Sequence, residues 1–297
     1  RLYLIYFITI MGINLHAFNY LRKIAKENEF KKTLTIGRQK ISADKYLVNQ
    51  IINDDTINSK FIDQYLIKHF RSSSVDILDV NNYEEANIIH NLNENIPKNL
   101  EEKFDTIIDG GSLEHIFDVK TSMINLKKMC KPGGIIIHLS PTNNFCGHGF
   151  YQFSPNLFHT FYGEDQGFKN TEIILCKVFD SNHWYKIKRE NYKNNKRIDI
   201  ITDEETFVFC SAIKENSINY KFVQQSDYSE DFYENQKKLS HSNKNVSKIN
   251  KFRIMKLKIA NRLSLIKKIY NYFRKISEYR YKKLNKFNKN LEIINLK

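Results

Sequence analysis

The chain has 297 residues, with 47 Lys and Arg against 33 Asp and Glu and a formal net charge of +14. Ten Gly and four Pro exclude a collagen-like or proline-rich protein. The four Cys, at 130, 146, 176 and 210, form no CxxC pair, which excludes a zinc ribbon and argues against a disulfide scaffold. From Asn235 to Lys297 there are 19 basic and two acidic residues, whereas the rest of the chain has 28 basic and 31 acidic. The basicity therefore belongs to the tail and says nothing about the ligand of the main domain.

The chain divides into four predicted parts. Residue 1 is Arg and residues 2–10 are apolar but short, so residues 1–11 are interpreted as an N-terminal extension. A packed N-terminal element and a membrane-directed segment are the alternatives. An α/β domain is predicted over 12–225, a polar linker over 226–250 and a basic amphipathic helical tail over 251–297.

Strand and helix patterns alternate along the α/β domain. Helical spacing of apolar residues appears at 43–53 and 60–70, and again from Leu113 to Met129, where Ser112 is the expected N-cap and the KPGG of 131–134 the stop. β-Rich runs occur at 33–37, 74–79, 86–90, 104–109, 135–140, 171–179 and 206–213. This alternation predicts a doubly wound, mostly parallel sheet covered on both faces. Ligands of such sheets bind at the carboxyl ends of the strands.

The segment FDTIIDGGSLEHIFDVKTSMINLKKMCKPGGIIIHLSP at 104–141 resembles the second half of a class I S-adenosylmethionine-dependent methyltransferase domain. The stretch NNFCGHGFYQFSPNLF at 143–158 is similar to a bacterial subgroup of these domains often associated with surface-polysaccharide gene clusters. The resemblance covers roughly residues 12–215. It implies a seven-stranded Rossmann-type sheet, S-adenosylmethionine as the cofactor and methyl transfer to a sugar or glycan precursor as the activity.

The first glycine loop departs from the family pattern. Where GxGxG is usual after the first strand, this chain has Gly37-Arg38-Gln39-Lys40. Arg38 is predicted either to pair with the carboxylate of the cofactor's methionine part or to fill the space where the cofactor would lie. The second alternative would make the chain a degenerate, non-catalytic methyltransferase fold that serves as a binding or scaffold protein.

The resemblance also suggests the other cofactor-binding residues. Asp79 ends the second strand, where an acid would accept both ribose hydroxyls, and Asp76 is the alternative. Asn91 stands where an acid would read the adenine amino group, or it is a turn residue. Asp109, followed by Gly110 and Gly111, would hold the cofactor's amino group or orient a substrate hydroxyl, or else cap the next helix.

Two histidines are the candidate general bases. His115 lies in the first turn after the fourth strand, and imidazole suits proton transfer near neutral pH. His148 lies between Gly147 and Gly149, which free the backbone to bring the ring into a cleft, and the aromatic residues of 150–153 would be a platform for a sugar ring. Asp109 is the third catalytic candidate. No metal site is predicted, because the nine His show no HxH, HxxxH or HxxE spacing beside acids.

The tail is a predicted basic amphipathic helix, with apolar residues every three or four positions between 252 and 276. A packing helix with solvated Lys, an anionic membrane surface and nucleic acid are its three interpretations, nucleic acid being the least favoured. The expected partners are thus a small-molecule or glycan substrate and, through the tail, a peripheral membrane contact. The expected location is cytoplasmic, with the inner-membrane surface as the alternative.

Overall fold

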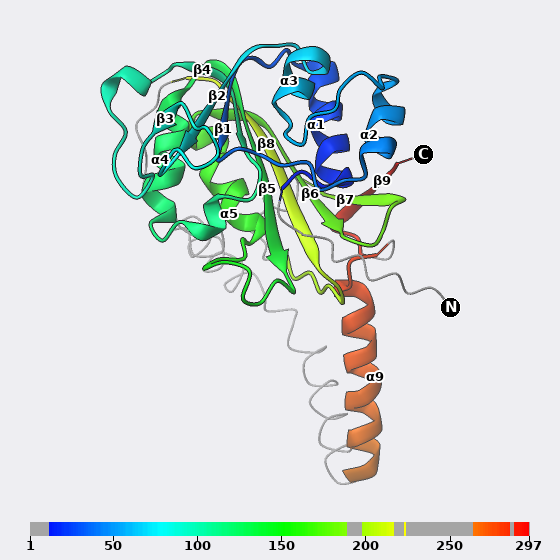
Figure 1. Ribbon diagram of the computed structural model, residues 1–297. Coiled ribbons are helices and arrows are strands. Elements are labelled where there is room, and N and C mark those ends of the chain that lie inside the picture. The colour runs from blue at the N-terminus through cyan, green and yellow to red at the C-terminus, as the bar shows by residue number, and fades with distance from the viewer. Residues whose placement is uncertain (1–11, 189–197, 217–222, 224–263, 286–287, 297) are drawn as a thin grey trace. The chain divides into compact units, whose positions relative to one another are not determined.

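A computed structural model describes residues 12–188, 198–216, 223, 264–285 and 288–296 (Figure 1). The chain forms two compact units. The first comprises Arg1–Lys186, Glu204–Phe222 and Ile294–Lys297, and the second comprises Ile187–Asp203 and Val223–Ile293. The predicted extension at 1–11 and linker at 226–250 lie outside the described residues, so these domain limits stay predictions.

The first unit is a sheet with helices on both faces, as predicted. Its helices are α1 (Leu15–Glu27), α2 (Lys45–Ile52), α3 (Asp63–His69), α4 (Val119–Met129) and α5 (Pro155–Phe161). Short 3₁₀ turns occur at Lys98–Leu100, Leu113–His115 and Glu164–Gln166. The strands are β1 (Lys31–Ile36), β2 (Ser72–Asp79), β3 (Ile88–Ile89), β4 (Phe104–Asp109), β5 (Cys130–Asn143), β6 (Phe168–Lys177), β7 (His183–Ile187) and β8 (Thr206–Lys214).

Within this unit the strands follow the order β3-β2-β1-β4-β5-β8-β6-β7. The pairs from β3 to β5 are parallel, and β8 is antiparallel to both β5 and β6. This is the arrangement expected of a class I methyltransferase-type Rossmann sheet. The predicted number of seven strands is wrong, because β7 pairs antiparallel with β6 and adds an eighth within the unit.

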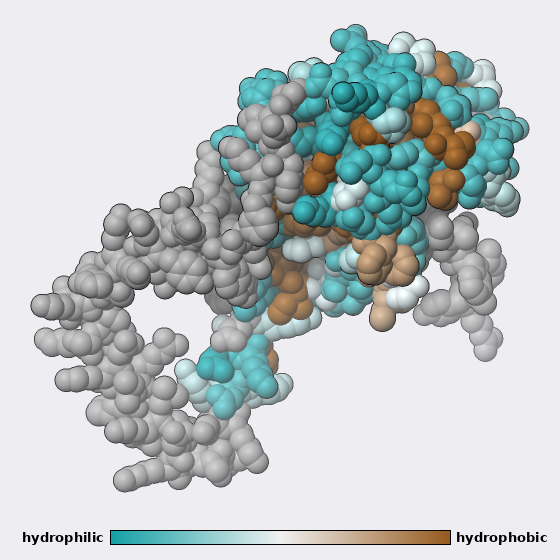
Figure 2. Space-filling view, turned by 90° about the vertical axis from the view of Figure 1, so that its left-hand side faces the viewer, coloured by the Kyte–Doolittle hydropathy of each residue, from teal (hydrophilic) through white to brown (hydrophobic). Residues whose placement is uncertain are grey.

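The two faces of the sheet have different packing partners. Alternate residues of β5, Ile135, Ile137 and Leu139, belong to one apolar cluster with Phe18 and Leu21 of α1. Figure 1 shows α1, α2 and α3 grouped on one side of the sheet and α4 and α5 on the other. The visible face in Figure 2 is mostly hydrophilic with hydrophobic patches between.

Two helical features differ from the sequence prediction. The pattern analysis missed α1, although Asn14 caps it by accepting from the N–H of Ala17. Ser112 makes no side-chain cap bond, and the helix expected from Leu113 is split into a 3₁₀ turn and α4. Asp118 is the actual N-cap of α4, because its carboxylate accepts from the N–H of Thr121 at 2.9 Å. By contrast, Ser154 is the N-cap of α5, with Pro155 in its first turn, as predicted.

The second unit contains α9 (Ser264–Lys282) and most of β9 (Leu291–Asn295). The end of α9 is tied to an earlier segment of the same unit, since the N–H of Ile201 donates to the carbonyl of Lys282 at 2.8 Å. Lys282 also pairs with Asp199 at 2.7 Å. The predicted tail helix is therefore present from residue 264, and its part before that lies outside the described residues.

One face of α9 exposes apolar side chains, among them Ile269, Phe273 and Ile276. No helix in the described residues is both long enough and apolar enough to cross a bilayer. The predicted peripheral membrane contact stays a prediction.

A row of buried, hydrogen-bonded side chains connects β4, β5 and the residue that follows α5. His138 on β5 lies 2.8 Å from Asp109 Oδ2 through Nδ1 and 2.6 Å from the Tyr162 hydroxyl through Nε2. All three side chains are fully buried. A neutral imidazole with its proton on Nδ1 satisfies both bonds, donating to the carboxylate and accepting from the phenol. Burial raises the pKa of Tyr162 well above its ordinary value, so its hydroxyl keeps the proton it donates.

We expect His138→Ala to lower the free energy of unfolding by about 3–5 kcal/mol, because it leaves Oδ2 of the buried Asp109 carboxylate without its partner. Urea unfolding at neutral pH measures the loss. His183→Ala is the matched control, since His183 pairs with Asp180 at the surface and should cost less than about 1 kcal/mol. Equal, small losses in both variants would show that this row of side chains is not a major source of stability.

Candidate active site

A cavity of about 710 Å³ lies at the carboxyl ends of β1, β2 and β4. It is the place predicted for a ligand of a doubly wound sheet. Six of the predicted site residues line it: Gly37, Arg38, Asp79, Asn91, Gly110 and His115. Asp109 and His148 are not among the lining residues.

The loop after β1 keeps one glycine, and that glycine is needed. Gly37 has φ +69°, and its N–H donates to the carbonyl of Leu78 at 2.8 Å. A Cβ at this position would lie 3.1 Å from Ser112 Oγ and 3.8 Å from Asp79 Oδ2. The bare backbone of Gly37 therefore lies between the ends of the two neighbouring strands.

Gln39 takes the place of the missing glycines, and the sequence analysis gave it no role. Its side chain is buried and donates through Nε2 to the carbonyl of Ile36 at 2.6 Å. Ser112 Oγ donates to the same carbonyl at 2.6 Å. A Cβ on Gly110 would lie 2.3 Å from Gln39 Oε1, so the amide occupies the space that a side chain at 110 would need.

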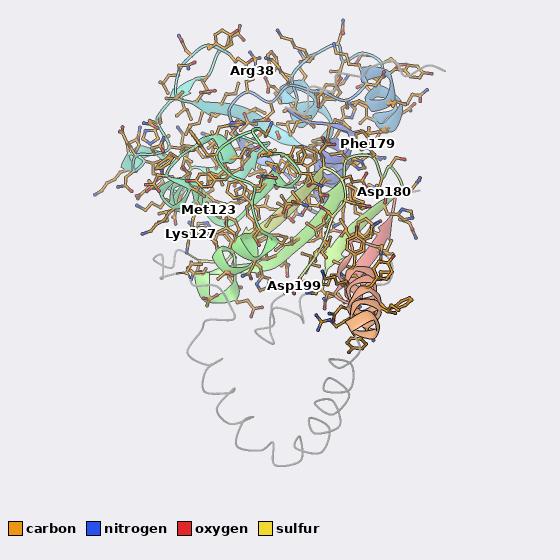
Figure 3. The ribbon with its side chains drawn as sticks, turned by 90° about the horizontal axis from the view of Figure 1, so that it is seen from below. Arg38, Met123, Lys127, Phe179, Asp180 and Asp199 are labelled. Atoms are coloured by element: carbon orange, nitrogen blue, oxygen red, sulfur yellow. The ribbon has the colours of Figure 1, made fainter. Side chains whose placement is uncertain are left out.

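Arg38 lies at the edge of the cavity, held by acids on two elements. Its Nε donates to Asp63 Oδ2 at 2.9 Å, and Nη1 pairs with Glu85. The guanidinium carbon lies 4.1 Å from the centre of the Phe61 ring. Figure 3 shows Arg38 well separated from Met123 and Lys127 of α4.

The two acids of β2 differ in their surroundings. Asp79 lines the cavity, and one of its oxygens accepts from the N–H of Val80 at 2.6 Å. Its other oxygen has no hydrogen-bond partner among the described residues. Asp76 accepts from Asn87 Nδ2 at 2.7 Å and does not line the cavity. Of the two candidates for the ribose, Asp79 is therefore the better placed.

Asn91 lies where it could contact an adenine and is also a turn residue, so both interpretations of the sequence apply to it. It lines the cavity, yet its Oδ1 accepts from the N–H and the side-chain amide of Asn93, at 3.1 and 2.9 Å. This is a turn stabilised by an Asn side chain.

Asp109 is fully buried and organises the loop that follows β4. Oδ1 accepts from the N–H groups of Ser112 and Leu113, at 2.9 and 3.2 Å, while Oδ2 bonds His138. Both oxygens are used inside the protein. The predicted contacts of Asp109 with cofactor or substrate stay predictions. Its bonds to the N–H groups of Ser112 and Leu113 match the alternative, in which the acid caps the element that follows β4.

Glu114, His115 and His148 meet beside the cavity. His148 Nε2 lies 3.7 Å from Glu114 Oε1, and the centres of the two imidazole rings are 5.2 Å apart. The sequence placed His115 and His148 separately and gave Glu114 no role, since the residues come from different loops. Burial raises the pKa of Glu114, with His148 opposing the rise. Burial and the charge of His148 lower the pKa of His115.

Aromatic side chains lie on the two loops that carry this group, though not all those expected. Phe117 and Phe150 are exposed and meet edge to face at 5.9 Å, and the Tyr151 hydroxyl donates to the carbonyl of Phe117. Phe153 is 4% exposed and belongs to the interior, so it cannot be part of a surface platform. Phe117 is the aromatic residue that the sequence analysis missed.

Comparison with known proteins gives structural neighbours only. No family model matches the sequence, and no curated protein matches it. A putative methyltransferase from Bacillus halodurans C-125 is 8% identical, with a TM-score of 0.40, 67% of this chain and 99% of that chain covered.

Two further neighbours were solved with S-adenosylhomocysteine. The 1,6-didemethyltoxoflavin-N1-methyltransferase of Burkholderia thailandensis is 13% identical, with a TM-score of 0.38 and coverage of 67% of this chain and 78% of that chain. The phosphoethanolamine N-methyltransferase 2 of Haemonchus contortus is 11% identical, with a TM-score of 0.41 and coverage of 70% and 55%.

The loop that carries His148 depends on Gly149. A Cβ there would lie 2.8 Å from the backbone oxygen of Glu114. We expect Gly149→Ala to displace the loop, to cost about 1–3 kcal/mol of stability and to shift the ring resonances of His115 and His148 in NMR spectra. Gly133→Ala is the control: its φ of +81° makes alanine strained, but its Cβ meets nothing within 4 Å, so it should cost stability without shifting the resonances of His115 and His148. Unchanged histidine resonances in Gly149→Ala would contradict the assigned packing.

Proposed function

We propose that this chain is an S-adenosylmethionine-dependent methyltransferase acting on a sugar or glycan precursor in surface-polysaccharide biosynthesis. The observation that carries the cofactor half is the meeting of Gly37 and Asp79 in one cavity at the ends of β1 and β2. The carboxylate of Asp79 has an unused oxygen that can accept from the ribose hydroxyls of the cofactor. The backbone of Gly37 carries no side chain, so the amino-acid part of the cofactor can approach it closely.

The residues present fit this cofactor. A volume of about 710 Å³ is in the range of sites for ligands of this size. A Cβ at Gly37 would be in close contact with Ser112, so only the bare backbone leaves the approach open. When bound, S-adenosylmethionine supplies a methyl group on a positively charged sulfur.

The chain's own residues then have distinct tasks. Asp79 accepts from the ribose hydroxyls, and Asn91 contacts the adenine edge. The backbone of Gly37 and Gly110 borders the amino-acid part, and Arg38 faces its carboxylate. Asp109 acts as a positioning residue, since it fixes the amides of Ser112 and Leu113 rather than touching a ligand.

The acceptor half of the proposal depends on His115, His148 and the aromatic side chains around them. His115 lines the cavity, so an acceptor held there lies next to the cofactor site. The exposed rings of Phe117 and Phe150 offer apolar surface of the kind that the less polar face of a sugar ring contacts. Alignment of the acceptor with the methyl group is the main catalytic requirement.

A second function has one observation in its favour. The buried Gln39 side chain occupies the space beside Gly110, where the family pattern has only backbone. A methyltransferase fold that no longer binds a cofactor would tolerate a side chain in this space. The alternative is therefore a binding or scaffold protein without catalysis.

We expect Asp79→Ala to weaken binding of S-adenosylhomocysteine by about 1.5–3 kcal/mol, or roughly 10- to 150-fold, because it removes the acceptor for the ribose. Isothermal titration calorimetry measures the change. Asp76→Ala is the matched control from the same strand and should leave the affinity unchanged. Equal affinities for wild type and Asp79→Ala would contradict the proposed cofactor site.

Arg38→Ala separates the two functions by the sign of its effect. If Arg38 holds the carboxylate, the variant binds S-adenosylhomocysteine about tenfold or more weakly. An analogue that lacks the carboxylate should then bind wild type and variant alike. Lys60→Ala is the control, since Lys60 also lies against the Phe61 ring but does not line the cavity. Tighter binding by Arg38→Ala would favour the non-catalytic alternative.

A further inference from the structure

A compact set of metal-binding side chains lies beside the proposed cofactor cavity. One ligand atom each from Glu114, His115 and His148 lies within 4.8 Å of the other two. Within the described parts of the chain this is the one such group of three. Its members come from the turn after β4 and from the loop after β5, which explains why sequence spacing did not reveal it.

The carboxylate of Glu114 lacks a hydrogen-bond partner for one of its oxygens. Its side chain is only 1% exposed, and Oε2 is a buried oxygen with no hydrogen-bond partner. Oε1 has His148 Nε2 at 3.7 Å, which is too long for a hydrogen bond. No Lys or Arg of the described residues forms an ion pair with it. A buried carboxylate oxygen without a hydrogen-bond partner is costly, and a bound cation would remove that cost.

The backbone around Glu114 holds the group in place. Its carbonyl oxygen accepts from the N–H groups of Phe150 and Tyr151, at 2.8 and 3.3 Å, so the His148 loop is fixed to the residue whose carboxylate it faces. Gly149 permits the close approach. On the other side, Gly111 has φ +97°, and a Cβ there would lie 3.0 Å from Glu114 Oε1. Gly111 therefore keeps side-chain atoms away from the carboxylate, and Gly149 lets the His148 loop approach the backbone of Glu114.

The spacing of the donors is near that of a metal centre. Metal–nitrogen distances of about 2.0–2.1 Å place tetrahedral donors about 3.3 Å apart. The 3.7 Å between Glu114 and His148 is close to this value. The ligand atoms of all three residues lie within 4.8 Å of one another, so side-chain movements of up to about 1.5 Å would bring in His115. Two imidazoles and one carboxylate favour a divalent transition-metal ion over Mg²⁺ or Ca²⁺, which take oxygen ligands.

We propose that Glu114, His115 and His148 bind a divalent transition-metal ion at the acceptor side of the cavity. Three protein ligands leave a position open, as in catalytic metal sites. Since His115 lines the cavity, the open position would face the space proposed for the acceptor.

The second half of the inference concerns the acceptor and rests on the proposed function. A hydroxyl bound to a divalent cation releases its proton to water more readily than a free one, and its oxygen would then form the bond to the methyl group as the bond between methyl and sulfur breaks. The site therefore favours an oxygen nucleophile, an alcohol or a phenol, as the atom to be methylated. His115 and His148 would then act as ligands in place of the predicted general bases.

The test uses the untagged, metal-free full chain, titrated with Co²⁺ and followed by its visible absorption, with Zn²⁺ as the competitor. We expect one Co²⁺ per chain, displaced by Zn²⁺. Glu114→Gln, which keeps the size of the side chain, and His148→Ala should each weaken binding at least tenfold. His183→Ala removes a surface His next to Asp180, and Cys146→Ser removes the exposed thiol near His148; both should bind as wild type does.

Several outcomes would overturn the proposal. Wild type that binds no Co²⁺ would do so, as would a Glu114→Gln variant that is folded by circular dichroism and binds like wild type. Loss of binding in Cys146→Ser or His183→Ala would place the metal elsewhere. A parallel titration with S-adenosylhomocysteine separates the two proposals. Nucleoside binding without metal binding refutes only the metal site, whereas metal binding without nucleoside binding refutes the proposed function and leaves the site intact.

Discussion

The Asp109 carboxylate is the constraint on which both halves of the candidate site depend. One oxygen is bound to the imidazole of His138 on the neighbouring strand, and the other collects two backbone amides from the turn that follows β4. A fully buried anion is stable only when its hydrogen bonds are complete. Once the chain has placed this group in the interior, the turn must take the shape that satisfies it.

From that turn the two halves of the site extend in different directions. Ser112 reaches back to the carbonyl of Ile36 and so fixes the loop after β1, beside which the cofactor is proposed to lie. Glu114 reaches forward, and its carbonyl receives the loop that carries His148. The same few residues of backbone therefore set the distance between the cofactor side and the acceptor side. In a reaction controlled by alignment, that distance is the quantity that matters.

The fold was largely predictable because its signals are local and strong. The apolar run at 135–140 and the FDTIID strand at 104–109 have the pattern of buried strands, and both are strands. The helix expected from Leu113 begins later than predicted, because Asp109 takes the amides of Ser112 and Leu113 and Asp118 caps the helix further on. Hydrophobic spacing cannot report a competing carboxylate on another element.

The site was predictable only in part, for a similar reason. Glycines and acids that follow strands could be expected at one edge of the sheet, and Gly37, Asp79 and Gly110 do line one cavity. Glu114 was overlooked because its importance comes from burial and from His148, 34 positions later, neither of which a sequence pattern contains. Gln39 was overlooked because nothing in its neighbourhood shows that its side chain turns inward.

The packing of Gln39 against Gly110 has a consequence for how this loop can change over evolution. The amide fills the space between the two loops and donates to the carbonyl of Ile36, so glycine at 39 alone would leave a void and remove one of the two hydrogen bonds to that carbonyl. A larger residue at 110 alone would collide with the amide. The glycine-rich and the glutamine-filled forms of the loop are thus separated by intermediates less stable than either, and a lineage that has adopted one form will tend to keep it.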